Sequence, residues 1–161
     1  MKAAVFFLAM MVFGQSSELE EIRELYQQAP EEEAAARQLM QKTENYRDNE
    51  PLMFAYKGAA HMMMAKHVIN PFSKMSHFNK GKKIYTAAID ADPNNLELRF
   101  LRFSVQSEAP GFLGYKQNVE EDKSLLLAGT TKINDAALKK MIMDYLLSSE
   151  ALTAAEKKKL E

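Results

Sequence analysis

The sequence contains no cysteine and no tryptophan, and only six glycines and five prolines occur among its 161 residues. Without cysteine no disulfide can form, so stability has to come from packing of an apolar core, and a thiol nucleophile is excluded. A lipoprotein also needs a cysteine to carry its lipid, so we do not expect one. Alternating β-branched runs and Asn-Gly or Asp-Gly turns, which indicate strands and hairpins, are absent too. These absences predict an all-α protein.

The sequence also lacks the motifs that indicate common catalytic sites. It has no Gly-x-Ser-x-Gly elbow, no His-Glu-x-x-His helix and no glycine-rich phosphate loop. The acidic triplet of residues 120–122 is able to hold a general acid or a cation, but carboxylates at a helix N-terminus also complement the helix dipole. We therefore expect a protein that is not an enzyme and uses no cofactor. The net charge of −1 gives no support for a nucleic-acid partner.

The N-terminus has the form of a secretory signal, with Lys2 followed by eleven apolar residues and then Gly14. This apolar run is too short to span a bilayer, which needs about 20 residues. An uncleaved, buried helix is the alternative. We expect residues 1–14 to be a cleaved signal peptide and the mature chain, residues 15–161, to be a single helical domain without a transmembrane segment. The protein would then be exported, either to the periplasm or out of the cell.

Charge is distributed unevenly along the chain. Residues 18–50 contain ten acids and four bases, whereas residues 51–89 contain six lysines and no acid. The simplest interpretation is that neighbouring helices attract each other weakly across exposed faces. A basic surface for an acidic partner is the alternative.

The five prolines lie about twenty residues apart, and proline is excluded from helix interiors. This spacing predicts seven to eight helices arranged as stacked antiparallel hairpins. The expected helices cover residues 17–28, 31–45, 51–69, 74–91, 95–107, 118–128, 134–148 and 153–160. We expect Asn94, Asn118 and Thr153 to be N-caps, each with a glutamate three residues later. Gly129 is expected to be a left-handed C-cap.

Residues 81–95 resemble the second helix and closing turn of a tetratricopeptide repeat. The resemblance rests on a small residue, an aromatic residue, an alanine and a proline at the family's offsets, here Gly81, Tyr85, Ala88 and Pro93. It covers one half-repeat, and the break at Pro71 makes the repeat unit nearer forty residues than the family's thirty-four. The resemblance implies a tetratricopeptide-like scaffold that binds another protein or a peptide. The whole chain also resembles small exported bacterial proteins for which no activity is known.

If that resemblance holds, Arg99 and Arg102 are the first candidates for partner binding. They lie three residues apart and so share a helix face, where two guanidiniums are suited to clamp a carboxylate. The alternative is that they pair within the chain, with Glu97, Asp92 or the acids of residues 120–122.

The loop of residues 108–118 is the second candidate, because it carries Phe112 and Leu113 between two glycines and Tyr115 directly after the second. Such side chains are either packed into the core or exposed to a partner. The predicted partner-binding residues are Arg99, Arg102, Phe112 and Tyr115.

A methionine- and histidine-rich segment supports two alternative functions. His61, Met64 and His67 are spaced by three, and thioether and imidazole ligands suit Cu(I), so a periplasmic copper protein is one alternative. Methionine is also a common filler of helical cores. The other alternative is a structural or lipid-facing envelope protein that uses its apolar methionine and phenylalanine surface.

Overall fold

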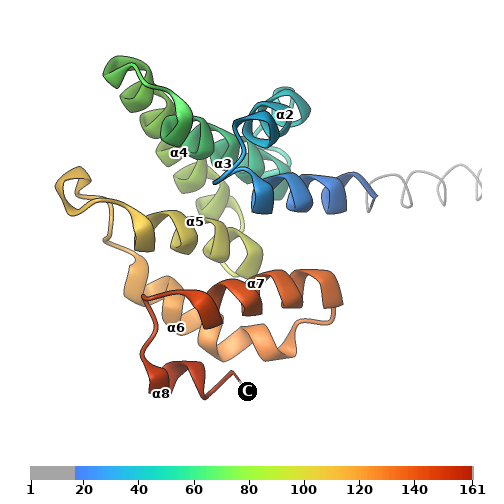
Figure 1. The fold of residues 1–161 in the computed structure, drawn as a ribbon. Coiled ribbons are helices and arrows are strands. Elements are labelled where there is room, and N and C mark those ends of the chain that lie inside the picture. Colours follow the sequence, from blue (N-terminus) through green and yellow to red (C-terminus); the bar gives the residue numbers. More distant parts are fainter. Residues whose placement is uncertain (1–16, 161) are drawn as a thin grey trace, which may run out of the picture. The chain divides into compact units, whose positions relative to one another are not determined.

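The computed structural model describes residues 17–160 of the chain (Figure 1). The predicted signal peptide, residues 1–14, lies outside the described residues. Within them the fold is all-helical, with eight α-helices and no strand, which confirms the predicted fold class. These residues form two compact units, residues 17–84 and residues 85–160, and each is described by itself. That residues 15–161 form one tetratricopeptide-like domain stays a prediction.

The helices follow one another with short connections. The first covers residues 17–28. The others are α2 (Glu33–Thr43), α3 (Pro51–His67), α4 (Pro71–Ala91), α5 (Leu96–Glu108), α6 (Val119–Gly129), α7 (Ala136–Ser148) and α8 (Ala154–Lys157), with the short 3₁₀ helices η1 (Gly111–Leu113) and η2 (Thr130–Lys132). The boundary between the two units falls within α4.

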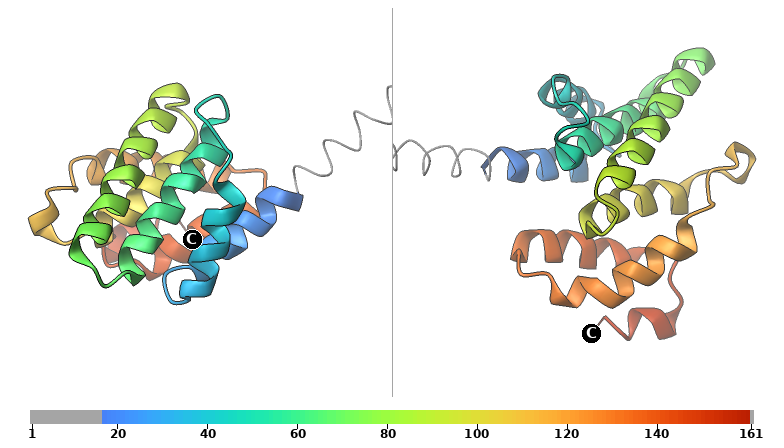
Figure 2. Two further views of the ribbon diagram at one scale, coloured as in Figure 1. Left: turned by 90° about the horizontal axis from the view of Figure 1, so that it is seen from above. Right: turned by 180° about the vertical axis from the view of Figure 1, so that it is seen from behind.

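In the first unit α3 lies beside α2 and α4 (Figure 2). Apolar or small residues occupy most of the sides of α3. Tyr26 meets Tyr56 edge-on, with ring centroids 5.8 Å apart, in a geometry that aromatic pairs prefer. Gly58 of α3 and Gly81 of α4 face each other so closely that a Cβ on Gly81 would lie 2.8 Å from the carbonyl oxygen of Gly58. The absence of side chains at these two positions therefore permits the close approach of α3 and α4.

The second unit packs α5 against α6 and α7. Tyr145 of α7 meets the rings of Phe100 and Phe103 edge-on, at centroid distances of 5.5 and 6.2 Å. Its hydroxyl donates to the carbonyl oxygen of Ser104 at 3.1 Å, so the polar end of the ring is satisfied as well. Phe100 and Phe103 are almost fully buried. The apolar side chains of α5 thus form much of this unit's core.

Local sequence explains where several helices begin. Thr153 and Glu156 form the predicted capping box at α8. The cap of α5 is Asn95 rather than the predicted Asn94, because Asn95 Oδ1 accepts from the backbone amides of residues 97 and 98. Asn118 precedes α6 but makes no side-chain cap hydrogen bond, so the predicted capping box there is wrong.

One further local prediction is wrong, and one helix begins slightly earlier than expected. Gly129 has φ −112° and so is not a left-handed cap; its missing Cβ would lie 2.5 Å from Leu96 Cδ1, so packing accounts for the glycine. The helix α4 begins at Pro71 instead of residue 74, since Asn70 Oδ1 accepts from the amides of Phe72 and Ser73 and so caps the new helix.

Among residues 17–160, no helix combines the length and the hydropathy needed to cross a bilayer.

Candidate functional site

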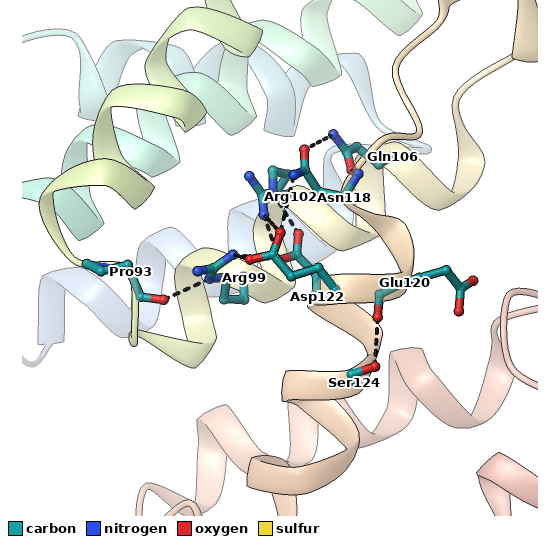
Figure 3. Close-up of polar contacts among 9 residues, drawn as sticks. Pro93, Arg99, Arg102, Gln106, Asn118, Glu120, Asp122 and Ser124 are labelled. Carbon is teal, nitrogen blue, oxygen red and sulfur yellow. Dashed lines mark hydrogen bonds and ion pairs between the residues drawn. The ribbon is translucent and has the colours of Figure 1, made fainter.

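Arg99 and Arg102 lie on one face of α5 and point at the first turn of α6, where they share the carboxylate of Asp122 (Figure 3). Arg102 binds it with two hydrogen bonds, Nε to Oδ2 at 2.6 Å and Nη2 to Oδ1 at 2.7 Å. Arg99 Nη1 donates to the same Oδ1 at 3.1 Å and to Glu121 Oε1 at 2.7 Å. Of the two alternatives left open by the sequence, the structure shows the internal one, with the acids of residues 121 and 122.

Most of this ionic cluster is buried, although the side chain of Glu121 is 54% exposed. The side chain of Asp122 is 0% exposed, and those of Arg99 and Arg102 are 10% and 11% exposed. Two guanidiniums face two carboxylates, so the charges cancel locally, as buried ions require. Burial by itself lowers the pKa of Arg102, but the hydrogen bonds and charge of Asp122 outweigh it and raise that pKa. The hydrogen bond from Arg99 lowers the pKa of the Glu121 carboxyl.

Further hydrogen bonds fix both ends of this cluster. Arg99 Nε donates to the carbonyl oxygen of Pro93 at 2.8 Å, which ties the turn before α5 to the helix itself. Gln106, fully buried on α5, exchanges two hydrogen bonds with Asn118 at the start of α6: Gln106 Oε1 accepts from the Asn118 amide at 3.2 Å, and Gln106 Nε2 donates to Asn118 Oδ1 at 3.3 Å (Figure 3). The relative placement of α5 and α6 is therefore set by polar contacts.

The loop between α5 and α6 separates the two predicted aromatic residues. Tyr115 is 4% exposed, and burial raises the pKa of its hydroxyl to about 12. Phe112, on η1, is 87% exposed. Gly114 follows in the left-handed conformation, with φ 58°, which turns the chain from η1 back toward the buried Tyr115. The loop is thus anchored at one aromatic residue and exposes the other.

The structure does not bring the three candidate copper ligands, His61, Met64 and His67, together at one place. His61 Nδ1 lies 2.9 Å from His77 Nδ1 of α4, while His67 Nε2 lies 2.7 Å from the carbonyl oxygen of Ala29. Met64 is buried. Burial lowers the pKa of His61 to about 4, and the charges of His77 and of two lysines act in the same direction. Such a cationic environment disfavours a bound cation.

Within residues 17–160, no three histidine, aspartate or glutamate side chains lie close enough together to share a metal ion. His77 is the contact of His61 that sequence reasoning did not identify. The sequence could have indicated this contact, because both histidines lie near the connected ends of two helices that form a hairpin.

Sequence reasoning also missed Gln106, Ile69 and Phe72. Nothing in the sequence indicated the role of Gln106, because the partner of an uncharged amide on an apolar helix is not predictable from the sequence. Ile69 and Phe72 flank Asn70 and Pro71, and they are 94% and 87% exposed. Exposure of this kind becomes visible only once the helix ends are known.

Comparisons of this chain with protein-family models, with curated proteins and with solved structures found no match. The resemblance to a tetratricopeptide repeat and to small exported bacterial proteins therefore stays a prediction, as does export itself.

Proposed function

We propose that this chain is a non-enzymatic helical module that binds another protein through Phe112 on the loop between α5 and α6. The observation that carries the proposal is that Phe112 is 87% exposed on a loop whose conformation is held by hydrogen bonds. Leaving such a ring in water forgoes roughly 1.5–3 kcal/mol that burial would provide. Large side chains that become buried on binding dominate the energy of protein interfaces.

The loop is held in a defined conformation, which favours binding. The amide of Leu113 donates to the carbonyl oxygen of Pro110 at 3.0 Å, and Gln117 Nε2 donates to that of Gly114 at 2.6 Å. Lys116 Nζ reaches back to the carbonyl oxygen of Ser107 at 3.3 Å. A preorganised loop loses little conformational entropy when a partner docks.

Arg99 and Arg102 take an indirect part in this proposal. Their guanidiniums are engaged with Asp122 and Glu121, and they hold the two helices from which the loop emerges. We propose that they position the loop, whereas Phe112 makes the contact. Every charged group in this cluster already has a partner of opposite sign. None of them is thus available as a free general acid or base, which supports a non-enzymatic role.

A photo-crosslinking experiment tests this function. A photoreactive phenylalanine analogue is placed at position 112 and, as a control, at Leu125, an exposed apolar residue of α6 in the same unit. We expect one protein to crosslink at position 112 and not at position 125. Purified binding of that protein should then weaken about tenfold or more in F112A, which corresponds to about 1.4 kcal/mol.

Equal crosslinking at both positions, or unchanged affinity of F112A with unchanged helicity, would contradict the proposal. A matched L125A variant should bind with wild-type affinity, because its side chain lies outside the loop.

A further inference from the structure

The turn between α3 and α4 exposes several large apolar side chains. Three large apolar side chains, those of Ile69, Phe72 and Met75, are 94%, 87% and 45% exposed within seven residues. A group of exposed large apolar side chains this close together in the chain marks a candidate interaction site. This turn belongs to the first unit, whereas the Phe112 loop belongs to the second.

The turn is ordered by its own hydrogen bonds. Asn70 Oδ1 accepts from the amides of Phe72 and Ser73 at 2.9 and 3.2 Å, and its carbonyl oxygen accepts from the amide of Lys74 at 2.9 Å. The amide of Val68 donates to Met64 and ends α3. These hydrogen bonds fix the start of α4, with Ile69 just before it and Phe72 just after it. The conformation of the turn therefore keeps both side chains exposed.

Positive charge surrounds these apolar side chains. Lys66 and Lys74 are exposed on the last turn of α3 and the first turn of α4, and residues 51–89 contain no aspartate or glutamate. Lys66 Nζ lies 3.5 Å from Glu31 Oε1, a contact between exposed groups that water screens strongly. The surface thus combines an apolar tip with flanking ammonium groups on long, flexible side chains.

We propose that this tip, defined as residues 66–75, binds the surface of an anionic phospholipid bilayer. Ile69 and Phe72 enter the boundary between headgroups and acyl chains, while Lys66 and Lys74 remain at the level of the phosphates. Each lysine near an anionic surface adds about a fivefold gain in affinity. A protein groove is a poorer fit, because the apolar side chains project from the end of a helical hairpin and both charged residues within residues 66–75 are lysines.

The absence of cysteine allows a direct test. S73C in the full chain carries a single environment-sensitive fluorophore next to Phe72, in place of an exposed serine. With vesicles of phosphatidylcholine and phosphatidylglycerol we expect the emission to shift to shorter wavelength and to be quenched by nitroxide-labelled lipid. Pure phosphatidylcholine vesicles should give little change. The probe reports its own surroundings, so attachment through another part of the chain leaves it unchanged.

Two variants and one control position sharpen the result. In the S73C background, I69S/F72S and K66E/K74E should each raise the apparent dissociation constant at least about tenfold. The same fluorophore on S148C, at an exposed serine of α7, should not respond.

Three outcomes would overturn the proposal. The first is no spectral shift at position 73 with anionic vesicles. The second is an equal shift on neutral vesicles that survives K66E/K74E. The third is a shift that depends on protein concentration without vesicles, which would assign the tip to a second copy of the chain. Because the test leaves Phe112 untouched, its failure does not bear on the proposed protein contact.

Discussion

The seam between α3 and α4 and the seam between α5 and α6 use opposite physical means to hold two helices together. Gly58 and Gly81 let α3 and α4 approach so closely that a Cβ added to Gly81 would lie 2.8 Å from the carbonyl oxygen of Gly58. Between α5 and α6, Arg99, Arg102 and Asp122 bury full charges instead. The contact between the two glycines is destabilised by any added side-chain atom. The contact between buried ions is destabilised when one charged partner is removed. The comparison predicts which kind of substitution damages each unit.

The largest expected effect follows from removing the shared acceptor. Asp122→Ala leaves two guanidiniums buried beside α6 with too few acceptors, which should cost about 3–5 kcal/mol of unfolding free energy. Urea denaturation measures this loss. The matched control is Asp144→Ala, which removes an exposed ion pair to Lys140 and should cost less than about 0.5 kcal/mol. Similar losses in both variants would show that burial of the cluster does not matter.

The next effect comes from the glycine seam. Gly81→Ala places a Cβ 2.8 Å from the backbone oxygen of Gly58, which cannot move aside, and 2.8 Å from Met62 Cγ. We expect a loss of about 1–3 kcal/mol from overpacking, larger than the gain of up to about 1 kcal/mol from alanine's helix propensity. Thermal unfolding measures the balance. Gly111→Ala, where a Cβ meets no atom within 4 Å, is the control and should be nearly neutral.

Acidification should weaken the first seam by a smaller amount. Burial and nearby positive charge lower the pKa of His61 from 6.5 to about 4, and burial lowers the pKa of His77 as well. A histidine kept neutral by folding binds protons more readily when unfolded, so its contribution is complete above pH 6.5 and is lost as the pH falls toward 4. Because His61 is only partly buried, we expect only about 1 kcal/mol between pH 7 and pH 5.

Urea midpoints at these two pH values check the prediction, and H61Q/H77Q should abolish most of the difference. Glu121 and Glu156 also have lowered pKa values, but their contributions are lost only below pH 4.5. A wild-type midpoint that stays constant from pH 7 to pH 5 would contradict the assignment.

The smallest expected effect is at Phe112. F112S should change the unfolding free energy by less than about 0.5 kcal/mol, because the ring is 87% exposed. Thermal unfolding of F112S beside the wild type measures it. A loss above 1 kcal/mol would mean that the ring packs within the chain and is not presented to a partner.

The fold class was predictable because its signals are local. Proline spacing and the absence of strand patterns indicated an all-α chain, and Thr153 with Glu156 gave a capping box from four residues. The errors come from contacts between distant residues. Whether Gly129 serves a turn or a packing contact depends on Leu96, thirty-three positions earlier.

The candidate site was predictable only as a choice between alternatives. Two arginines on one helix face are equally suited to an external carboxylate or an internal one, and the choice depends on where α6 packs. The structure places Asp122 against both of them. In the loop that follows, composition alone gave no means to distinguish Phe112 from Tyr115, since exposure depends on the left-handed turn at Gly114.

A double-mutant cycle between Arg102 and Asp122 tests most directly the claim that the arginines serve the fold and Phe112 serves contact. The cycle compares the unfolding free energies of R102M, D122N, the double variant and the wild type in urea. We predict a coupling energy of about 2–3 kcal/mol, as expected for a buried charge pair joined by two hydrogen bonds. A coupling energy near zero would show that the guanidinium of Arg102 is not committed to Asp122 and is available to a partner, which would contradict the account.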